Sequence, residues 1–173
     1  MRYDAHAREL GPLRGRTEQR VKIADFRQYV GKEIGVSRWF EITQDRINGF
    51  ADLTEDWQAI HIDPIAAAQT SFGGTIAHGF LVLSLLSPML ADMLPKFEDR
   101  AMAINYGFDK VRFVSPVSVD ARIRGRFTLM EALSKLNGDR MHRFSVCVEI
   151  EGLTKLALVA EWLSLERPAA CDR

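Results

Sequence analysis

The sequence has few cysteines and no long uninterrupted apolar run among its 173 residues. Its two cysteines, Cys147 and Cys171, lie far apart and outside any CxxC or metal-ligand spacing, so neither a disulfide framework nor a metal site is indicated. The most apolar stretch, residues 79–91, is too short to span a bilayer and contains two serines and a proline. The N-terminus lacks the apolar core of a secretory signal, and we therefore expect a cytoplasmic protein.

The sequence also lacks an excess of either charge. The 23 basic side chains are balanced by 23 acidic ones, and the pI is about 6.9, which argues against a general affinity for nucleic acid or for an anionic membrane. The length and a hydrophobic content of 47% suit one globular domain. We predict an N-terminal extension over residues 1–22, a single domain over 23–167 and a short C-terminal tail over 168–173.

The first half of the chain predicts short elements. Residues 23–30 fit a short helix that ends at Gly31, and residues 36–42 have a strand-like composition. Thr43 is a candidate N-cap for a following helix. The expected apolar face of that helix comprises Ile47, Phe50, Ala51 and Leu53. Residues 54–76 show neither helical nor strand periodicity.

Residues 77–94 are apolar nearly all round, which predicts a helix in the middle of the domain, and Pro88 must bend or divide it. Four strands are then expected, over residues 102–119, 121–133, 141–150 and 155–165, with turns at Asn137-Gly138-Asp139 and Glu151-Gly152. One strand, a buried helix and four antiparallel strands make an α+β arrangement. This order predicts the hotdog fold, an antiparallel sheet wrapped around a central buried helix.

The residues best suited to catalysis lie in the stretch without helical or strand periodicity. Asp56 and His61 are five residues apart, so in a continuous helix their side chains would point roughly 140° apart. They can share a site only if the backbone leaves the helix between them, and Pro64 just downstream disfavours helix there. The spacing alone is weak evidence for a catalytic pair.

Asp56 and His61 are followed by Pro64 and Phe72, and a His78-Gly79-Phe80-Leu81 motif then opens the apolar helix. In this pattern the chain resembles the (R)-specific enoyl-CoA hydratases and the wider MaoC-like dehydratases, including the nodulation-protein-N-like branch. Their D-x-N-P-x-H motif departs here at Gln58 and Ala59. The similarity runs from about residue 26 to residue 165, and residues 50–81 are the part specific enough to indicate function.

The resemblance implies reversible addition of water across the double bond of a trans-2-enoyl thioester, which gives a (3R)-hydroxyacyl thioester. Asp56 and His61 would be the catalytic pair that holds the water and transfers its protons. The N–H of Gly79 would donate a hydrogen bond to the thioester oxygen, on which negative charge develops. Ser87, Gln58 and Trp57 are candidate substrate-binding residues. No cofactor is implied besides the coenzyme A or acyl carrier protein that the substrate itself carries. A hotdog subunit is expected to form a homodimer, with the active site near the subunit boundary.

The sequence also allows other roles for these residues and for the chain. Asp56 and His61 could be a capping residue and a surface histidine, His78 could serve to fix the loop before Gly79, and Ser87 could instead support a helix kink. The chain could also be a hotdog acyl-thioesterase or a non-catalytic acyl-binding subunit. A thioesterase of this fold needs a carboxylate on the central helix, and residues 79–91 contain none.

Overall fold

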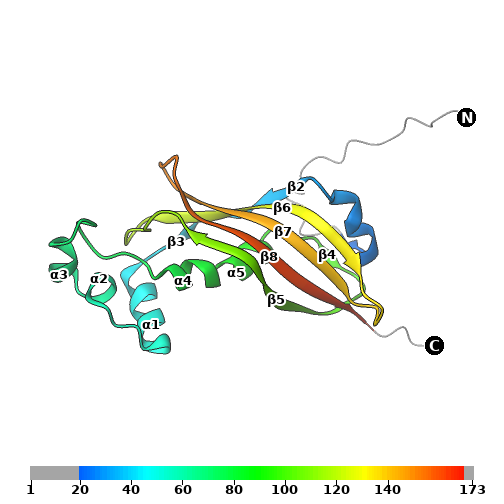
Figure 1. Cartoon of the computed structure of the whole chain (residues 1–173), viewed down its shortest axis with the longest axis horizontal. Coiled ribbons are helices and arrows are strands. Elements are labelled where there is room, and N and C mark those ends of the chain that lie inside the picture. Colours follow the sequence, from blue (N-terminus) through cyan, green and yellow to red (C-terminus); the bar gives the residue numbers. More distant parts are fainter. Residues whose placement is uncertain (1–19, 170–173) are drawn as a thin grey trace, which may run out of the picture.

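The computed structural model describes residues 20–169 (Figure 1). Most of the expected N-terminal extension and C-terminal tail lies outside the described residues. In chain order the elements are β1 (Arg20–Val21), the 3-10 helix η1 (Ile23–Tyr29), β2 (Glu33–Val36), β3 (Phe40–Glu41), α1 (Gln44–Thr54), α2 (Ala59–Ile62), α3 (Pro64–Ala68), α4 (Gly79–Ser84), α5 (Leu86–Ala91), β4 (Lys96–Phe97), β5 (Arg100–Phe113), β6 (Arg122–Ser134), β7 (Arg140–Ile150) and β8 (Leu156–Pro168).

The main sheet is antiparallel and runs in the order β2-β6-β7-β8-β5, with β3 also paired to β6. Along β7 the residues predicted to share one face, Phe144, Val146, Val148 and Ile150, are all buried. This alternation buries one side of the strand, because successive side chains point to opposite faces. The two predicted turns are also present, and Gly138 and Gly152 adopt the positive φ of 89° and 75° that such tight turns require.

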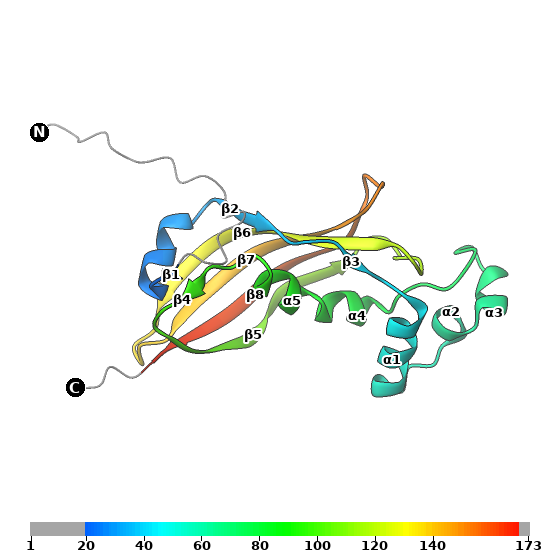
Figure 2. The ribbon, with the colours of Figure 1, turned by 180° about the vertical axis from the view of Figure 1, so that it is seen from behind.

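The helix pair α4–α5 lies against the concave side of this sheet, so the α+β hotdog prediction is confirmed (Figure 2). The expected single apolar helix is divided at Leu85, between α4 and α5. Pro88 is the physical reason, since it has no N–H to donate to the carbonyl of Ser84, one helical turn earlier. The buried face consists of Leu81, Val82, Leu86, Met89 and Leu90. In contrast, Phe80 is 66% exposed, so the helix is not buried all round in a single subunit.

Several local predictions need correction. The strand expected over residues 36–42 is interrupted after Val36, where the Gly125 N–H donates to the Oγ of Ser37 instead of to a backbone carbonyl. The strand expected to reach residue 119 ends at Phe113. Leu53 was wrongly assigned to the apolar face of α1 and is 87% exposed. Six residues after Ile47, a helical side chain points roughly 240° around the axis, away from the buried side.

The helices α1, α2 and α3 extend beyond one end of the sheet (Figures 1 and 2). We call residues 43–78, which include these helices, the helical lobe. Thr43 caps α1 as predicted, with its side chain accepting a hydrogen bond from the N–H of Arg46 at 3.2 Å. Within residues 20–169, no helix has the length and apolar character needed to cross a membrane.

Candidate active site

Asp56 stands at the point where the chain leaves α1. Glu55 ends that helix in the left-handed conformation, with φ 58° and ψ 27°, and the Asp56 N–H then donates to the carbonyl of Ala51 at 3.2 Å. A left-handed residue turns the chain sharply out of the helix, a role more often filled by glycine. The backbone therefore leaves the helix directly before Asp56. Asp56 and His61, five residues apart, can share a site only because the two residues do not lie in one continuous helix.

His61 belongs to the next short helix, α2, which begins after Gln58. The His61 N–H donates to the Gln58 carbonyl at 2.9 Å. Asp63 follows as the N-cap of α3, with its carboxylate accepting from the N–H groups of Ile65 and Ala66, both at 3.0 Å. Pro64 occupies the first position of α3, where its missing N–H costs nothing. These two short helices, the second capped by Asp63, hold His61 facing back toward the end of α1.

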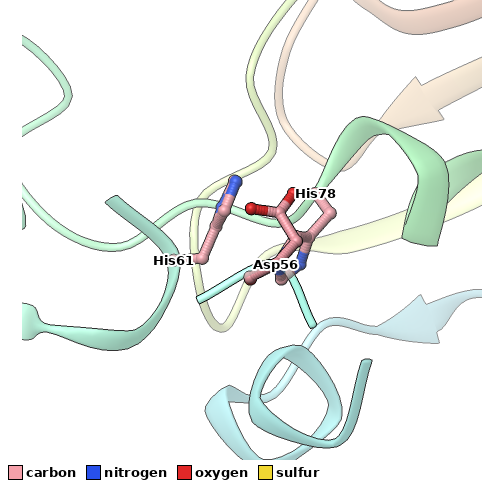
Figure 3. Close-up of side chains that lie close together, drawn as sticks. All are labelled: Asp56, His61 and His78. Atoms are coloured by element: carbon pink, nitrogen blue, oxygen red, sulfur yellow. The ribbon is translucent and has the colours of Figure 1, made fainter. Parts of the chain in front are cut away.

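Asp56, His61 and His78 converge, as Figure 3 shows, with one nitrogen or oxygen atom of each within 4.8 Å of those of the others. His61 is 6% exposed and its Nδ1–H donates to the carbonyl of Ile76 at 2.7 Å. A carbonyl can only accept, so this bond fixes the proton on Nδ1 and leaves Nε2 for chemistry. Burial lowers the pKa of His61 most strongly; the bond to Ile76 opposes that shift, His78 adds to it, and Asp56 opposes it.

His78 supports both members of the pair. Its ring is buried, its Nε2–H donates to the Asp56 carbonyl at 2.9 Å, and it stacks on His61 with 3.8 Å between ring centroids. One hydrogen bond thus fixes the main chain of Asp56, and one stacking contact fixes the plane of the His61 ring. A role for His78 in fixing the loop before Gly79 is consistent with these contacts.

A cavity of about 260 Å³ opens beside His61. It lies between α4, β8 and the segment that follows β5, and its lining includes Gly79, Val82, Phe113 and Ala157. A Cβ atom added to Gly79 would lie 3.0 Å from the Phe113 ring, so glycine permits this close approach. Gly79 is the first residue of α4, and within the described part of the chain its N–H has no hydrogen-bond acceptor. This N–H is therefore free to bind a substrate oxygen.

The other three candidate substrate-binding residues lie elsewhere in the single chain. Trp57 is 52% exposed and donates its Nε1–H to Asp52 at 3.0 Å, and Gln58 is also exposed. Neither residue lines the 260 Å³ cavity. Ser87 lines a separate cavity farther along the helix pair. Their roles in substrate binding stay predictions.

Gln44 is a residue of the site that sequence reasoning missed. Its Nε2 donates to the His61 carbonyl at 2.8 Å, and its Oε1 accepts from the Thr75 hydroxyl at 2.6 Å. Gln44 thereby ties the start of α1 to α2 and to the segment before α4. No local sequence pattern signals this role, since its partners lie 17 and 31 residues away.

Comparisons with known proteins show the family of the chain. The sequence profile of the MaoC like domain matches residues 25–150. The chain belongs to the MaoC-like dehydratase family. It is 47% identical to nodulation protein N of Rhizobium meliloti over 154 residues, which covers 88% of this chain and 96% of that protein. It is 45% identical to the 3-hydroxyacyl-thioester dehydratase Z of Mycobacterium tuberculosis over 139 residues, with 80% and 91% covered.

Among solved structures, the (R)-hydratase PhaJ1 from Pseudomonas aeruginosa matches with a TM-score of 0.66 and 25% identity. That match covers 82% of this chain and 83% of the other. The predicted family resemblance is confirmed, and the relatives of this MaoC-like chain include both hydratases and dehydratases.

Proposed function

We propose that this MaoC-like protein interconverts a trans-2-enoyl thioester and a (3R)-hydroxyacyl thioester by adding or removing water. The proposal rests chiefly on one observation. The Asp56 carboxylate and the His61 imidazole lie close together, and the Nδ1–H of His61 is held by the Ile76 carbonyl, so that Nε2 is the nitrogen left for proton transfer. General acid–base catalysis requires such positioned groups.

The proton balance of the proposed reaction needs one shared proton on the pair. For hydration, Asp56 is a carboxylate and His61 an imidazolium. The water oxygen bonds to Cβ and its proton passes to Asp56, while the electron pair of the double bond takes a proton at Cα from Nε2 of His61. The pair is left with Asp56 protonated and His61 neutral, which is the state that starts dehydration.

Gly79 supplies the complementary group for the thioester. As water adds to Cβ, negative charge develops on the thioester oxygen, and the N–H at the start of α4 can donate to it. The same cavity contains both His61 and Gly79, so one bound thioester can reach both. The carrier attached to the thioester, coenzyme A or acyl carrier protein, is part of the substrate, and no separate cofactor is needed.

We further propose that the working form is a homodimer joined through β5. This 14-residue strand lies at the edge of the sheet and pairs only with β8 among the described strands. Its exposed apolar side chains are Met102, Tyr106, Phe108 and Phe113. A long apolar edge of this kind is a liability in a monomer, and pairing with a second copy would cover it. Phe113 also contacts Gly79, which would bring the site close to the subunit boundary.

Turnover of crotonyl-CoA tests the reaction directly. We expect loss of the conjugated double bond without release of thiol, and a product of R configuration. Rapid release of free coenzyme A would instead identify a thioesterase, and no change in either signal would identify a non-catalytic subunit. The structure argues against thioesterase activity, because Asp92 is the first carboxylate after Gly79 and lies at the far end of α5. There it accepts a hydrogen bond from the Arg38 N–H and forms an ion pair with the Arg38 side chain. Light scattering that found an active monomer would contradict the proposed dimer.

A further inference from the structure

A second cavity, of about 360 Å³, lies between α5 and the strands β5 and β8. Its apolar lining comes mainly from the end of α5 and the segment after it. The rest of the lining includes Ser87, Arg100, Asn105, Trp162, Ser164 and Glu166. Several of these side chains are polar, which is unusual on the inner face of a sheet that otherwise contacts the core.

The polar groups on β8 are deeply buried. Trp162, Ser164 and Glu166 alternate along the strand, so they face the same side, and each is less than 5% exposed. Glu166 accepts from the Ser164 hydroxyl at 3.1 Å and has a long contact of 3.5 Å with Arg100. Burial raises the pKa of Glu166. The Nε1–H of Trp162 has no acceptor among residues 20–169. A buried donor without a partner is costly and calls for an explanation.

The helix side of the cavity is polar as well. Asn105 on β5 donates its Nδ2–H to the Ser87 Oγ at 3.1 Å, which leaves the Ser87 hydroxyl hydrogen and the Asn105 oxygen available. Asn105 is paired across the sheet with Ser164. Hydrogen-bonding groups therefore reach this cavity from α5, β5 and β8, three elements that meet only in the folded domain.

This cavity and the 260 Å³ cavity beside His61 lie one after the other along the helix pair α4–α5. α4 and α5 run end to end beside β5 and β8 (Figure 1). The first cavity is lined by Gly79, Phe113 and Ala157, and the second by Ser87, Asn105 and Trp162, farther along each of the same three segments. An acyl chain that extends from a thioester at Gly79 along α4 and α5 is therefore directed toward the second cavity.

We infer that the second cavity binds the distal part of an acyl chain that carries a hydroxyl group, and this inference rests on the proposed function. A hydroxyl can donate to a carboxylate and accept from an indole N–H, and Glu166 and Trp162, which carry these two groups, both line the cavity. A plain alkyl chain would cover these polar groups without adding a hydrogen bond to any of them, so the cavity discriminates against it.

The test compares matched pairs of trans-2-enoyl-CoA substrates of increasing length, with and without a terminal hydroxyl. At the length that reaches the second cavity, we expect kcat/KM to favour the hydroxylated member by about tenfold or more, the usual effect of a hydrogen bond to a charged group. Glu166→Gln and Trp162→Phe should each reduce that ratio by about tenfold. Glu149→Gln is the matched control, because Glu149 is an ion-paired β7 residue that does not line the cavity. This control should leave the ratio as it is in the wild type.

Binding of the saturated acyl-CoA pair, measured by calorimetry, separates the two proposals, because it requires no catalysis. Tighter binding of the hydroxylated compound without turnover would overturn the proposed reaction and support the cavity assignment. Turnover with a ratio of one or less at every length would overturn the cavity assignment alone. Melting curves of the two cavity variants verify folding. A ratio that survives in folded Glu166→Gln and Trp162→Phe would also overturn the assignment.

Discussion

The sheet and the helical lobe are held together in different ways. In the sheet, long strands pair along most of their length, and their buried side chains form the core. In the lobe, α2 and α3 have four and five residues, and the proposed catalytic residues are fixed by single contacts to Ile76, His78 and Gln44. The sheet therefore supplies most of the stability, and the lobe supplies the geometry of the candidate site. Variants in the two regions should separate these two properties.

The largest effect is expected in the lobe, from Asp56→Asn and His61→Ala. Each should lower kcat for enoyl-thioester hydration by about two to four decades, the usual range for loss of a positioned acid or base. The double variant should lose much less than the product of the two factors, because both groups act on one water. Steady-state kinetics with crotonyl-CoA measure all three. Near wild-type turnover in either folded single variant would assign that residue a structural role.

The next largest effect is expected from Gly79→Val, where the two regions meet. The new side chain must displace the Phe113 ring, which lies 3.0 Å from the position of the added Cβ. It should also crowd the thioester oxygen and lower kcat by about 10²–10³-fold, the typical cost of losing one oxyanion donor.

Thermal melting of Gly79→Val is the necessary control, because the same substitution could disturb the packing of α4. A folded variant with normal kinetics would show that the thioester oxygen is polarised by another group. Gln58, which replaces the asparagine of the family motif, would then be the leading candidate.

A third prediction concerns the sheet and its pH dependence. His142 on β7 is buried against Phe26, and burial, with a smaller effect from Arg140, lowers its pKa from 6.5 to about 4. Between pH 6.5 and 4, His142 therefore binds a proton in the unfolded chain but not in the folded one. The contribution of neutral His142 to the free energy of unfolding is therefore fully present above pH 6.5. About 3 kcal/mol of that free energy is lost as the pH falls to 4.

Denaturant unfolding of the wild type and of His142→Leu, followed between pH 7 and 4.5, measures this contribution as a difference. In the variant, the free energy of unfolding should fall less steeply with decreasing pH, because the part due to His142 is absent. Its kcat at neutral pH should stay close to that of the wild type. Parallel curves for the two proteins would place the pH dependence in other groups.

The same contrast explains what could be predicted from the sequence. The strands over residues 121–133 and 141–150 were placed to within a residue or so, because alternation along a strand is a local signal. The motif around His78 indicated the site through family resemblance. The convergence of Asp56 and His61 could not be derived from spacing, since it depends on a left-handed Glu55 and on a carbonyl 15 residues from His61. Contacts over such distances leave no periodic pattern.

The smallest effect is expected from Thr43→Ala, which removes the side-chain cap of α1. Loss of an N-cap costs about 1 kcal/mol, and here it should appear chiefly in the lobe. Hydrogen exchange of the α1 amides should accelerate about fivefold, while the amides of β7 keep their protection, because local opening of α1 need not unfold the sheet.

The same substitution on the sheet, Thr128→Ala on β6, serves as the control and should leave α1 exchange unchanged. Since Gln44 still links α1 to His61 and Thr75, kcat should fall only slightly. Equal acceleration in α1 and β7 would mean that the lobe and the sheet unfold as one unit, and the division between a stable sheet and a separately held site would then be wrong.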